Sequence, residues 1–268
     1  MYINILIIVL VIVSIIFLTT THAFKKKEGL KTKKNKDYLD GIDIIYWINL
    51  DRSHDRRKNM EKMFEDPIFK GKKIVRISAV DGKAPNIDSI LKDNFEGMQP
   101  DKFTKVEYAC TLSHINAIRE FSKTKDEVAL IMEDDMTLEY KPYWKNTINT
   151  IAKNAPSDWG IIQLCINTQI IPKKNYTKHN GDIYFSTGAY IINQNGAKNL
   201  INKTGIYTLN KTIGHSADVY LYLATNTYVY KYPYFTYNYQ TQSTIHPNHE
   251  NIHDTNKRLV DTFIYTRQ

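Results

Sequence analysis

Hydrophobic and polar residues alternate along the chain in blocks that predict strands followed by helices. Residues 43–49, 73–77 and 128–132 are short, nearly continuous runs of apolar and β-branched side chains, which is typical of buried strands. Residues 53–65 and 106–121 instead carry apolar side chains at helical spacing. Strands that alternate with helices predict an α/β fold with a mostly parallel central sheet, flanked by helices and joined by right-handed crossovers.

Weaker patterns extend this prediction toward the C-terminus. Residues 159–164 and 183–192 are expected to be further strands, and residues 193–202 and 217–224 short helices. The tyrosine-rich segment 228–239 is expected to form a closing pair of strands.

The N-terminal segment is predicted to be a membrane anchor. Residues 2–18 are almost entirely apolar. A helix over residues 2–24 would be roughly 34 Å long, enough to cross a hydrocarbon core of about 30 Å. A cleaved signal peptide is the alternative, but it would need a basic segment before the apolar run, which this sequence lacks. The predicted organisation is an anchor (residues 1–24), a basic stalk (25–40) and one folded domain (41–268).

The positive charge of the chain is concentrated in the stalk. Residues 25–36 contain seven lysines and one glutamate, which accounts for six of the eight net positive charges. A nucleic-acid partner is therefore not expected. The lysines form either a solvated stalk or a contact with anionic lipid headgroups. They predict a single-pass protein with its domain on the cytoplasmic side, whereas a lumenal enzyme would show the opposite charge bias.

Three predicted strands end in polar residues. These strand ends are Asn-Leu-Asp-Arg at 49–52, Ala-Val-Asp-Gly at 79–82 and Glu-Asp-Asp at 133–135. In open α/β sheets, ligands bind beyond the carboxyl ends of the strands. The three segments are therefore expected to build a single site.

The acidic segment 133–135 suggests a metal ion. Neighbouring carboxylates repel one another, and a divalent cation relieves that repulsion. Carboxylate oxygens suit Mg²⁺ or Mn²⁺. Strand alternation would place Glu133 and Asp135 on one face and Asp134 on the other, with Asp135 touching the metal directly. Glu133 would reach the metal or hold a ribose hydroxyl, and a solvated acidic loop is the alternative interpretation.

Several phrases follow one another in order along residues 42–245: YWINLDRSHDRR (46–57), RISAVDGK (76–83), EYACTLSH (107–114), ALIMEDD (129–135), STGAYI (186–191) and Asp218. Together they resemble glycosyltransferase family 25, which includes bacterial lipooligosaccharide and collagen hydroxylysine galactosyltransferases. The resemblance implies a GT-A-type, Rossmann-like nucleotide-sugar fold and inverting transfer from UDP-galactose or UDP-glucose. It also implies Mn²⁺ or Mg²⁺, and a glycan or hydroxylysine acceptor. Tyr108 and Ala109 depart from the family pattern, where a glycine-rich step is usual.

The resemblance and the chemistry together assign roles in donor binding. The expected nucleoside contacts are Asn49, Leu50, Arg52, Ala79 and Asp81, with Asp81 accepting the uracil N–H. Turn formation is the alternative role for Asn49 and Asp81. Glu133, Asp134 and His114 are expected to complete the donor site. The expected metal ligands are Glu133, Asp135 and His246; His249 and His253 are alternatives to His246, and an exposed polar tail is the other interpretation.

Two further residues have a predicted role beside the donor. Asp218 is the expected base that takes the acceptor proton, and an acid favoured at a helix N-terminus is the alternative. His114 lies on the apolar stripe of its helix with Cys110, so we expect a buried histidine that orients Glu133 or the phosphates. Cys110 is expected to be a core residue. The competing function is a non-catalytic sugar-nucleotide or glycan-binding membrane protein of the same fold.

Overall fold

The computed structural model describes residues 36–209, 214–238 and 250–266 of the 268-residue chain. The chain divides into two compact units, residues 1–37 and 38–268, and the folded domain is the second unit. The predicted anchor and residues 25–35 of the predicted stalk lie outside the described residues. Within the described residues, no helix is long and apolar enough to cross a bilayer.

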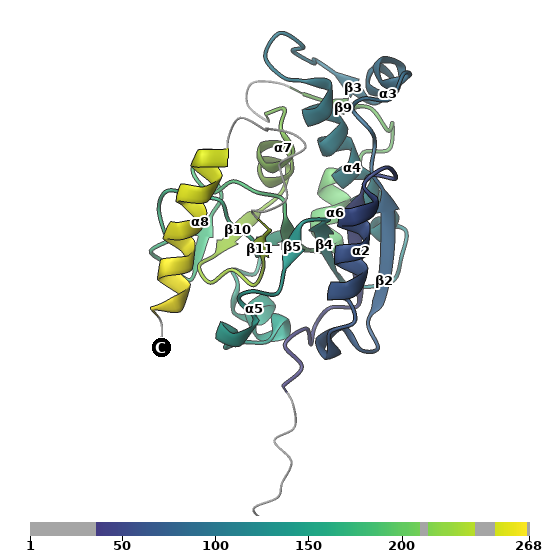
Figure 1. Ribbon diagram of the computed structural model, residues 1–268. Helices are drawn as coiled ribbons and strands as arrows, with labels where there is room; N and C mark the ends of the chain where they lie inside the picture. Colours follow the sequence, from purple (N-terminus) through teal and green to yellow (C-terminus); the bar gives the residue numbers. More distant parts are fainter. Residues whose placement is uncertain (1–35, 210–213, 239–249, 267–268) are drawn as a thin grey trace, which may run out of the picture. The chain divides into compact units, whose positions relative to one another are not determined.

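The fold is mixed α/β, built on a large central sheet (Figure 1). Within the described residues this sheet has seven strands in the order β2-β1-β4-β8-β6-β10-β7. The strands are β1 (Ile44–Asn49), β2 (Lys73–Ser78), β4 (Val128–Glu133), β6 (Ile161–Gln163), β7 (Tyr176–Lys178), β8 (Ala189–Asn193) and β10 (Thr227–Tyr230). Two small sheets pair β3 (Phe95–Glu96) with β9 (Tyr207–Thr208), and β5 (Met136–Thr137) with β11 (Thr236–Tyr237).

The central sheet is parallel only in part. The pairs β1/β2, β1/β4 and β6/β10 are parallel, but β8 runs antiparallel to both β4 and β6, and β7 antiparallel to β10. The prediction of a mostly parallel sheet is therefore wrong at β8 and β7, which run against the other five strands of this sheet. Parallel neighbours need a crossover, usually a helix, and the chain between β6 and β8 contains no helix that would provide one.

Helices cover both faces of the central sheet, which is why its inner strands are apolar on both sides. They are α2 (His54–Met63), α3 (Ile87–Asn94), α4 (Lys105–Ser122), α5 (Ile148–Asn154), α6 (Gln194–Leu200), α7 (Ala217–Ala224) and α8 (Glu250–Tyr265). Along β1, Ile45 and Trp47 belong to a core cluster that also contains side chains of α2, α5 and α8, whereas Ile44 and Tyr46 belong to a second cluster with side chains of α3, α4, α6 and α7. Alternate side chains of the strand therefore enter two separate cores.

The long helix α4 is fixed at its start by a capping box. The Thr104 hydroxyl accepts the Glu107 N–H at 3.3 Å, and the Glu107 carboxylate accepts the Thr104 N–H at 2.7 Å. This reciprocal pair satisfies donors that a helix N-terminus leaves free. It also fixes the helical register, and therefore which side chains of α4 face the ends of β1 and β4.

The structure corrects one prediction in the C-terminal half and adds two helices that were not predicted. The segment 228–239 does not form a strand pair with itself, because β10 pairs with β6 and β7 while β11 pairs with β5. The helices α5 and α8 were not predicted. The buried face of α8 includes Asn256 and Lys257, and these polar residues conceal its helical pattern.

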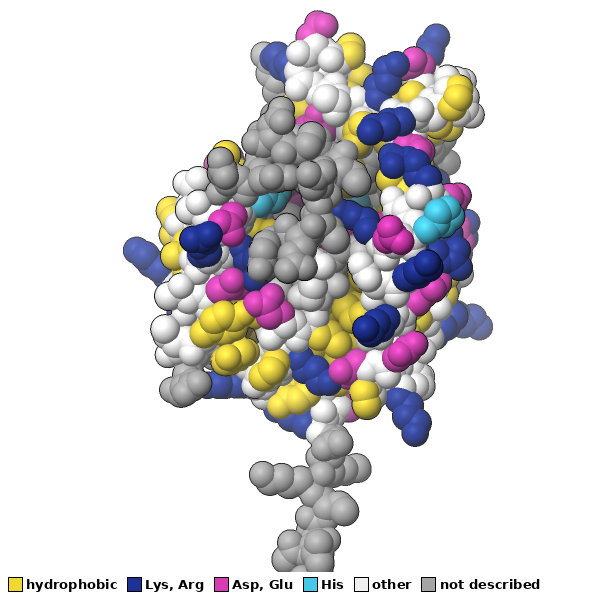
Figure 2. Space-filling model, viewed as in Figure 1, with side chains coloured by type: hydrophobic (Ala, Val, Ile, Leu, Met, Phe, Trp, Pro, Cys, Tyr) yellow, Lys and Arg dark blue, Asp and Glu magenta, His cyan; other side chains and the backbone are white. Residues whose placement is uncertain are grey.

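Charged side chains are mixed on the face shown in Figure 2. Lysine and arginine side chains lie among aspartate and glutamate side chains over the described part of that face. Their distribution agrees with the sequence, in which most of the net charge belongs to residues 25–36.

Candidate functional site

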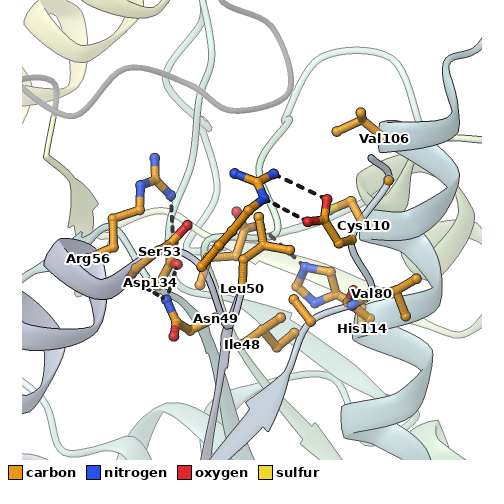
Figure 3. Close-up of a pocket in the computed structure, with 16 residues that line it drawn as sticks. Ile48, Asn49, Leu50, Ser53, Arg56, Val80, Val106, Cys110, His114 and Asp134 are labelled. Atoms are coloured by element: carbon orange, nitrogen blue, oxygen red, sulfur yellow. Dashed lines mark hydrogen bonds and ion pairs between the residues drawn. The ribbon is translucent and has the colours of Figure 1, made fainter. Parts of the chain in front are cut away.

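A cavity with an empty volume of about 600 Å³, open to solvent, lies where β1, β2 and β4 end beside α4 (Figure 3). The lining includes eight of the predicted donor-site residues, which are Asn49, Leu50, Arg52, Ala79, Asp81, His114, Glu133 and Asp134. The three polar strand ends therefore converge on one site. Asp135 and Asp218 lie outside the lining, and His246 lies outside the described residues.

Asn49 connects the end of β1 to the acidic segment. Its side chain is buried, and its Nδ2 donates to Asp134 Oδ2 at 2.7 Å (Figure 3). Its Oδ1 and its backbone carbonyl accept from the Arg76 guanidinium at 3.0 and 3.1 Å. The amide of Asn49 is thus occupied in holding Asp134 in place.

Arg52 and Asp81 form a two-bond ion pair at the rim of the cavity. Arg52 Nε donates to Asp81 Oδ2 at 2.7 Å, and Nη2 donates to Oδ1 at 3.2 Å. Asp81 Oδ1 also accepts the Lys83 N–H at 2.9 Å, as the turn alternative requires. The hydrogen bond from Arg52 lowers the pKa of Asp81, so a charged acceptor is available beside the cavity at neutral pH.

The three acids at the end of β4 have different partners. Arg56 Nη1 donates to Asp134 Oδ1 at 2.5 Å, and Arg56 Nη2 lies 3.3 Å from Asp135 Oδ2. Glu133 instead accepts from the Thr187 hydroxyl at 2.7 Å. The predicted alternation therefore separates Glu133 from Asp134, but it does not continue to Asp135, which follows the strand and shares Arg56 with Asp134.

Within the described residues, the acidic segment carries more negative charge than Arg56 neutralises. Burial, together with Glu133 and Asp134, raises the pKa of Asp135 to about 7. Burial alone would also raise the pKa of Glu133, but His114, Thr187 and Arg56 lower it below its usual value. One guanidinium thus faces three carboxylates, and their oxygens are the donors that a hard divalent cation prefers. Glu133 and Asp135 therefore fit the implied metal.

Asp218 is connected to this cluster through the turn between residues 185 and 188. It lies in the first turn of α7, and its Oδ2 accepts the Ser186 N–H at 3.4 Å. The next residue, Thr187, contacts Glu133. Asp218 Oδ1 also accepts the N–H of Val219 at 3.0 Å, a contact that the helix N-terminus alternative would provide.

That turn holds a strained residue. Ser186 has φ of 94°, which side chains other than glycine rarely adopt. Its carbonyl accepts from Gln163 Nε2 at 2.9 Å and from the Tyr222 hydroxyl at 2.7 Å. Strain of this kind persists where the surroundings determine it, often at functional sites. Two residues later, a Cβ on Gly188 would lie 2.5 Å from Met136 Cε, so a larger residue there would require the flexible end of the Met136 side chain to move.

Sequence reasoning missed several residues of the site. Arg56 lies on α2, which is mostly charged and exposed, and its pairing with Asp134 spans 78 positions. Thr187, Gln163 and Tyr222 were not assigned a specific contact. Cys110 was expected in the core, yet it lines the cavity and is partly exposed. His114 is fully buried beside Glu133, as its predicted position requires.

Comparison with known proteins identifies the family. The family model described as "Glycosyltransferase family 25 (LPS biosynthesis protein)" matches residues 42–220. Procollagen galactosyltransferase 2 of Homo sapiens is 28% identical over 178 residues, which cover 60% of this chain and 28% of the relative. Procollagen galactosyltransferase 1 of Danio rerio is 29% identical over 181 residues, with the same two shares of 60% and 28%. The chain thus spans under a third of the length of these relatives.

Two further comparisons are more distant. A Glycosyltransferase 25 family member of Drosophila melanogaster is 29% identical over 133 residues, covering 47% of this chain and 21% of the relative. Among solved structures, the inositol-1-phosphate CTP transferase from T. maritima matches 82% of this chain and 98% of its own. Its TM-score of 0.36, at 12% identity, is too low to establish a shared topology. The match over residues 42–220 takes in the loops at 49–52 and 79–82, the acidic segment and Asp218, and by it the chain belongs to glycosyltransferase family 25.

Proposed function

We propose that this glycosyltransferase is metal-dependent and inverting, and that it moves galactose or glucose from a UDP-sugar to a hydroxyl of a glycan or hydroxylysine acceptor. The observation that carries the proposal is the 2.7 Å hydrogen bond from Asn49 to Asp134. It joins the loop after β1, where the nucleoside would bind, to the acidic segment, where the pyrophosphate and its metal would bind. Both lie at the wall of one cavity, so the two parts of a UDP-sugar would bind side by side. The proposed fold is the GT-A type.

The donor would lie along the ends of β1, β2 and β4. The loops at 49–52 and 79–82 would hold the nucleoside, with the Asp81 carboxylate accepting the uracil N–H. Glu133 and Asp135 would hold Mn²⁺ or Mg²⁺, which when bound supplies positive charge for the leaving diphosphate. Arg56, 15% exposed, would keep Asp134 and Asp135 in place while the donor binds.

Asp218 would act as the base. Inverting transfer needs a carboxylate that takes the acceptor hydroxyl proton as the new glycosidic bond forms. Asp218 is half-buried, and its contact with Ser186 holds it near the segment that bonds Glu133. Asp218 lies outside the lining of the cavity proposed for the donor, which suits a group that faces the acceptor.

The relatives and the N-terminal sequence support the finer parts of the proposal. The procollagen galactosyltransferases carry galactose and procollagen in their names, which favours a galactose donor and a hydroxylysine acceptor among the alternatives. The apolar segment 1–24 and the lysine-rich segment 25–40 favour a single-pass membrane protein with its catalytic domain on the cytoplasmic side.

A donor screen with the purified full chain tests the proposal. Transfer or hydrolysis of UDP-galactose and UDP-glucose should require Mn²⁺ or Mg²⁺ and should stop on chelation. Asp135→Asn should lower kcat by about a hundredfold or more, the size expected when a charge-stabilising group is removed from an active site. Asp88→Asn changes an exposed acid paired with Lys105 at 2.7 Å and should leave the activity unchanged.

Two outcomes would contradict the proposal. Turnover that survives both chelation and Asp135→Asn would overturn the metal assignment. Absence of turnover, with equal binding of UDP and unrelated nucleotides, would favour the non-catalytic binding protein.

A further inference from the structure

A thiol, an imidazole and a carboxylate meet at the wall of the cavity, on the side away from Arg56. Cys110 and His114 are four residues apart on α4, so they share one face of the helix (Figure 3). Glu133 is the last residue of β4. One ligand atom of each of the three lies within 4.8 Å of the other two. We propose that Cys110, His114 and Glu133 form a second cation site, which takes a soft divalent ion such as Zn²⁺.

The spacing of the donors suits tetrahedral zinc. His114 Nε2 and Glu133 Oε1 lie 3.3 Å apart. Two ligands with zinc bonds of about 2.0 Å at a tetrahedral angle are separated by roughly 3.3 Å. With a zinc–sulfur bond of about 2.3 Å, the thiolate belongs roughly 3.6 Å from the nitrogen. A small rotation of Cys110, which is partly exposed at the cavity, completes the set.

His114 supplies an independent reason to place an ion here. Its side chain is 1% exposed, and its Nε2 is a buried polar atom without a hydrogen-bond partner. Its Nδ1 lies 3.2 Å from the Tyr190 hydroxyl. If Nδ1 carries the proton and donates to Tyr190, the lone pair of Nε2 faces the Glu133 carboxylate. A cation placed between them would bond to both atoms, and Tyr190 would fix the ring as outer partners of metal-bound histidines do.

The donor types select the class of metal. A thiolate and an imidazole favour zinc and similar ions, whereas Mg²⁺ and Mn²⁺ prefer oxygen. Three protein ligands leave a fourth position for water or a ligand in the cavity. Glu133 is also a ligand of the proposed Mn²⁺ site, so the two ions would compete for this carboxylate. The competition rests on the proposed function, whereas the zinc site itself does not.

Cobalt titration of the full chain, reduced and free of metal, tests the site. Co²⁺ takes the place of Zn²⁺, and a Co²⁺–thiolate bond gives charge-transfer absorption in the near ultraviolet. We expect this band to appear with Co²⁺ and to disappear when Zn²⁺ is added. Cys110→Ser should remove it. Cys165→Ser should keep it, because Cys165 is buried elsewhere and is the only other cysteine of the chain.

A positioning variant and a chemical measurement complete the test. Tyr190→Phe should weaken Co²⁺ binding about tenfold or more, as expected on loss of an outer partner. If Cys110→Ser does not fold, a chemical measurement replaces it. In the Cys165→Ser chain, where Cys110 is the remaining thiol, Zn²⁺ should slow alkylation of Cys110 at least about tenfold. Adding His114→Gln to that chain should abolish the protection. Absence of the band, its persistence in Cys110→Ser or its loss in Cys165→Ser would overturn the site. None of these measurements uses transferase activity, so failure of the proposed function leaves them unaffected.

Discussion

At the scale of single residues, Arg56 decides how the acidic segment can be occupied. Its guanidinium contacts Asp134 at 2.5 Å and Asp135 at 3.3 Å, and it lies close enough to Glu133 to lower that pKa. One permanent positive charge cannot neutralise three carboxylates. Burial and the negative charges of Glu133 and Asp134 raise the pKa of Asp135 to about 7. A divalent cation would supply the missing positive charge.

Mn²⁺ should stabilise the protein more at pH 8 than at pH 6. The pKa of Asp135 is raised from 3.8 to about 7. Between these values the folded state binds the proton more tightly than the unfolded chain, so stability falls as pH rises toward 7. A bound cation replaces the lost proton. The melting shift caused by a fixed Mn²⁺ concentration should therefore grow from pH 6 to pH 8 in differential scanning fluorimetry, and Asp135→Asn should remove this growth. A shift in the parent that does not change with pH would contradict the assignment.

Asp81→Ala should weaken UDP binding with little effect on folding. The Arg52 side chain in its ion pair is 47% exposed, and exposed pairs contribute about 1 kcal/mol or less. Loss of an acceptor for the uracil N–H should raise the Kd for UDP about tenfold, since a hydrogen bond to a charged group is worth about 1.5 kcal/mol or more. Calorimetric titration measures this. Asp88→Ala, in the matched pair with Lys105, should bind UDP as the parent does; equal Kd values for both variants would exclude the role of Asp81.

At the scale of elements, close backbone contact fixes α6 on the sheet. Asn193 caps α6 by accepting the Gly196 N–H at 2.8 Å, and its own N–H donates to the Gly160 carbonyl at 3.1 Å. A Cβ on Gly196 would lie 2.4 Å from that same carbonyl oxygen. The helix therefore meets the start of β6 where no side chain fits.

Gly196→Ala should destabilise the protein even though alanine favours a helix. Alanine gains about 1 kcal/mol in helix propensity over glycine, but the added methyl group would force α6 away from β6. We expect a net loss of about 1–3 kcal/mol, the usual cost of overpacking, measured by urea unfolding. Lys198→Ala, an exposed change on the same helix, should stay within about 0.5 kcal/mol. An unchanged urea midpoint for Gly196→Ala would show that α6 can move away from the start of β6 without loss of stability.

The elements also show what the sequence could reveal. Local periodicity predicted β1, β2, β4, α2, α4, α6 and α7 to within about two residues. It did not reveal that β8 is antiparallel or that β10 and β11 separate, because strand pairing depends on contacts between distant parts of the chain. The same limit applies to the site. Convergence of strand ends follows from topology and was predicted, whereas the Thr187–Glu133 contact spans 54 positions and has no local pattern.

At the scale of the whole molecule, α8 connects the C-terminal part of the described chain to the segment after β5. Its Lys257 side chain is 4% exposed and lies between Glu139 at 3.0 Å and Asp261 at 2.9 Å. Tyr140 donates to the same Asp261 at 2.6 Å. Val260 and Ile264 enter the core cluster that also contains Trp47 of β1. A polar network and apolar packing together hold the helix in place.

Lys257→Ala should be destabilising. Removal of the lysine takes away a buried side chain and leaves the partly exposed Asp261 and Glu139 without their counter-charge, which costs about 1–3 kcal/mol. Arg258→Ala is the neighbouring control, because Arg258 is 77% exposed in a surface pair with Asp254, and it should cost less than about 1 kcal/mol. Urea unfolding compares the two. Equal losses would show that α8 contributes through apolar contacts rather than through this ion pair.

The fixed charge of Arg56 also bears on how the enzyme would cycle. Because the guanidinium already holds Asp134 and Asp135 together, these two carboxylates would keep their arrangement without a bound ion. On the proposed function, the empty site would then be ready to take up the next cation and donor without rebuilding this arrangement.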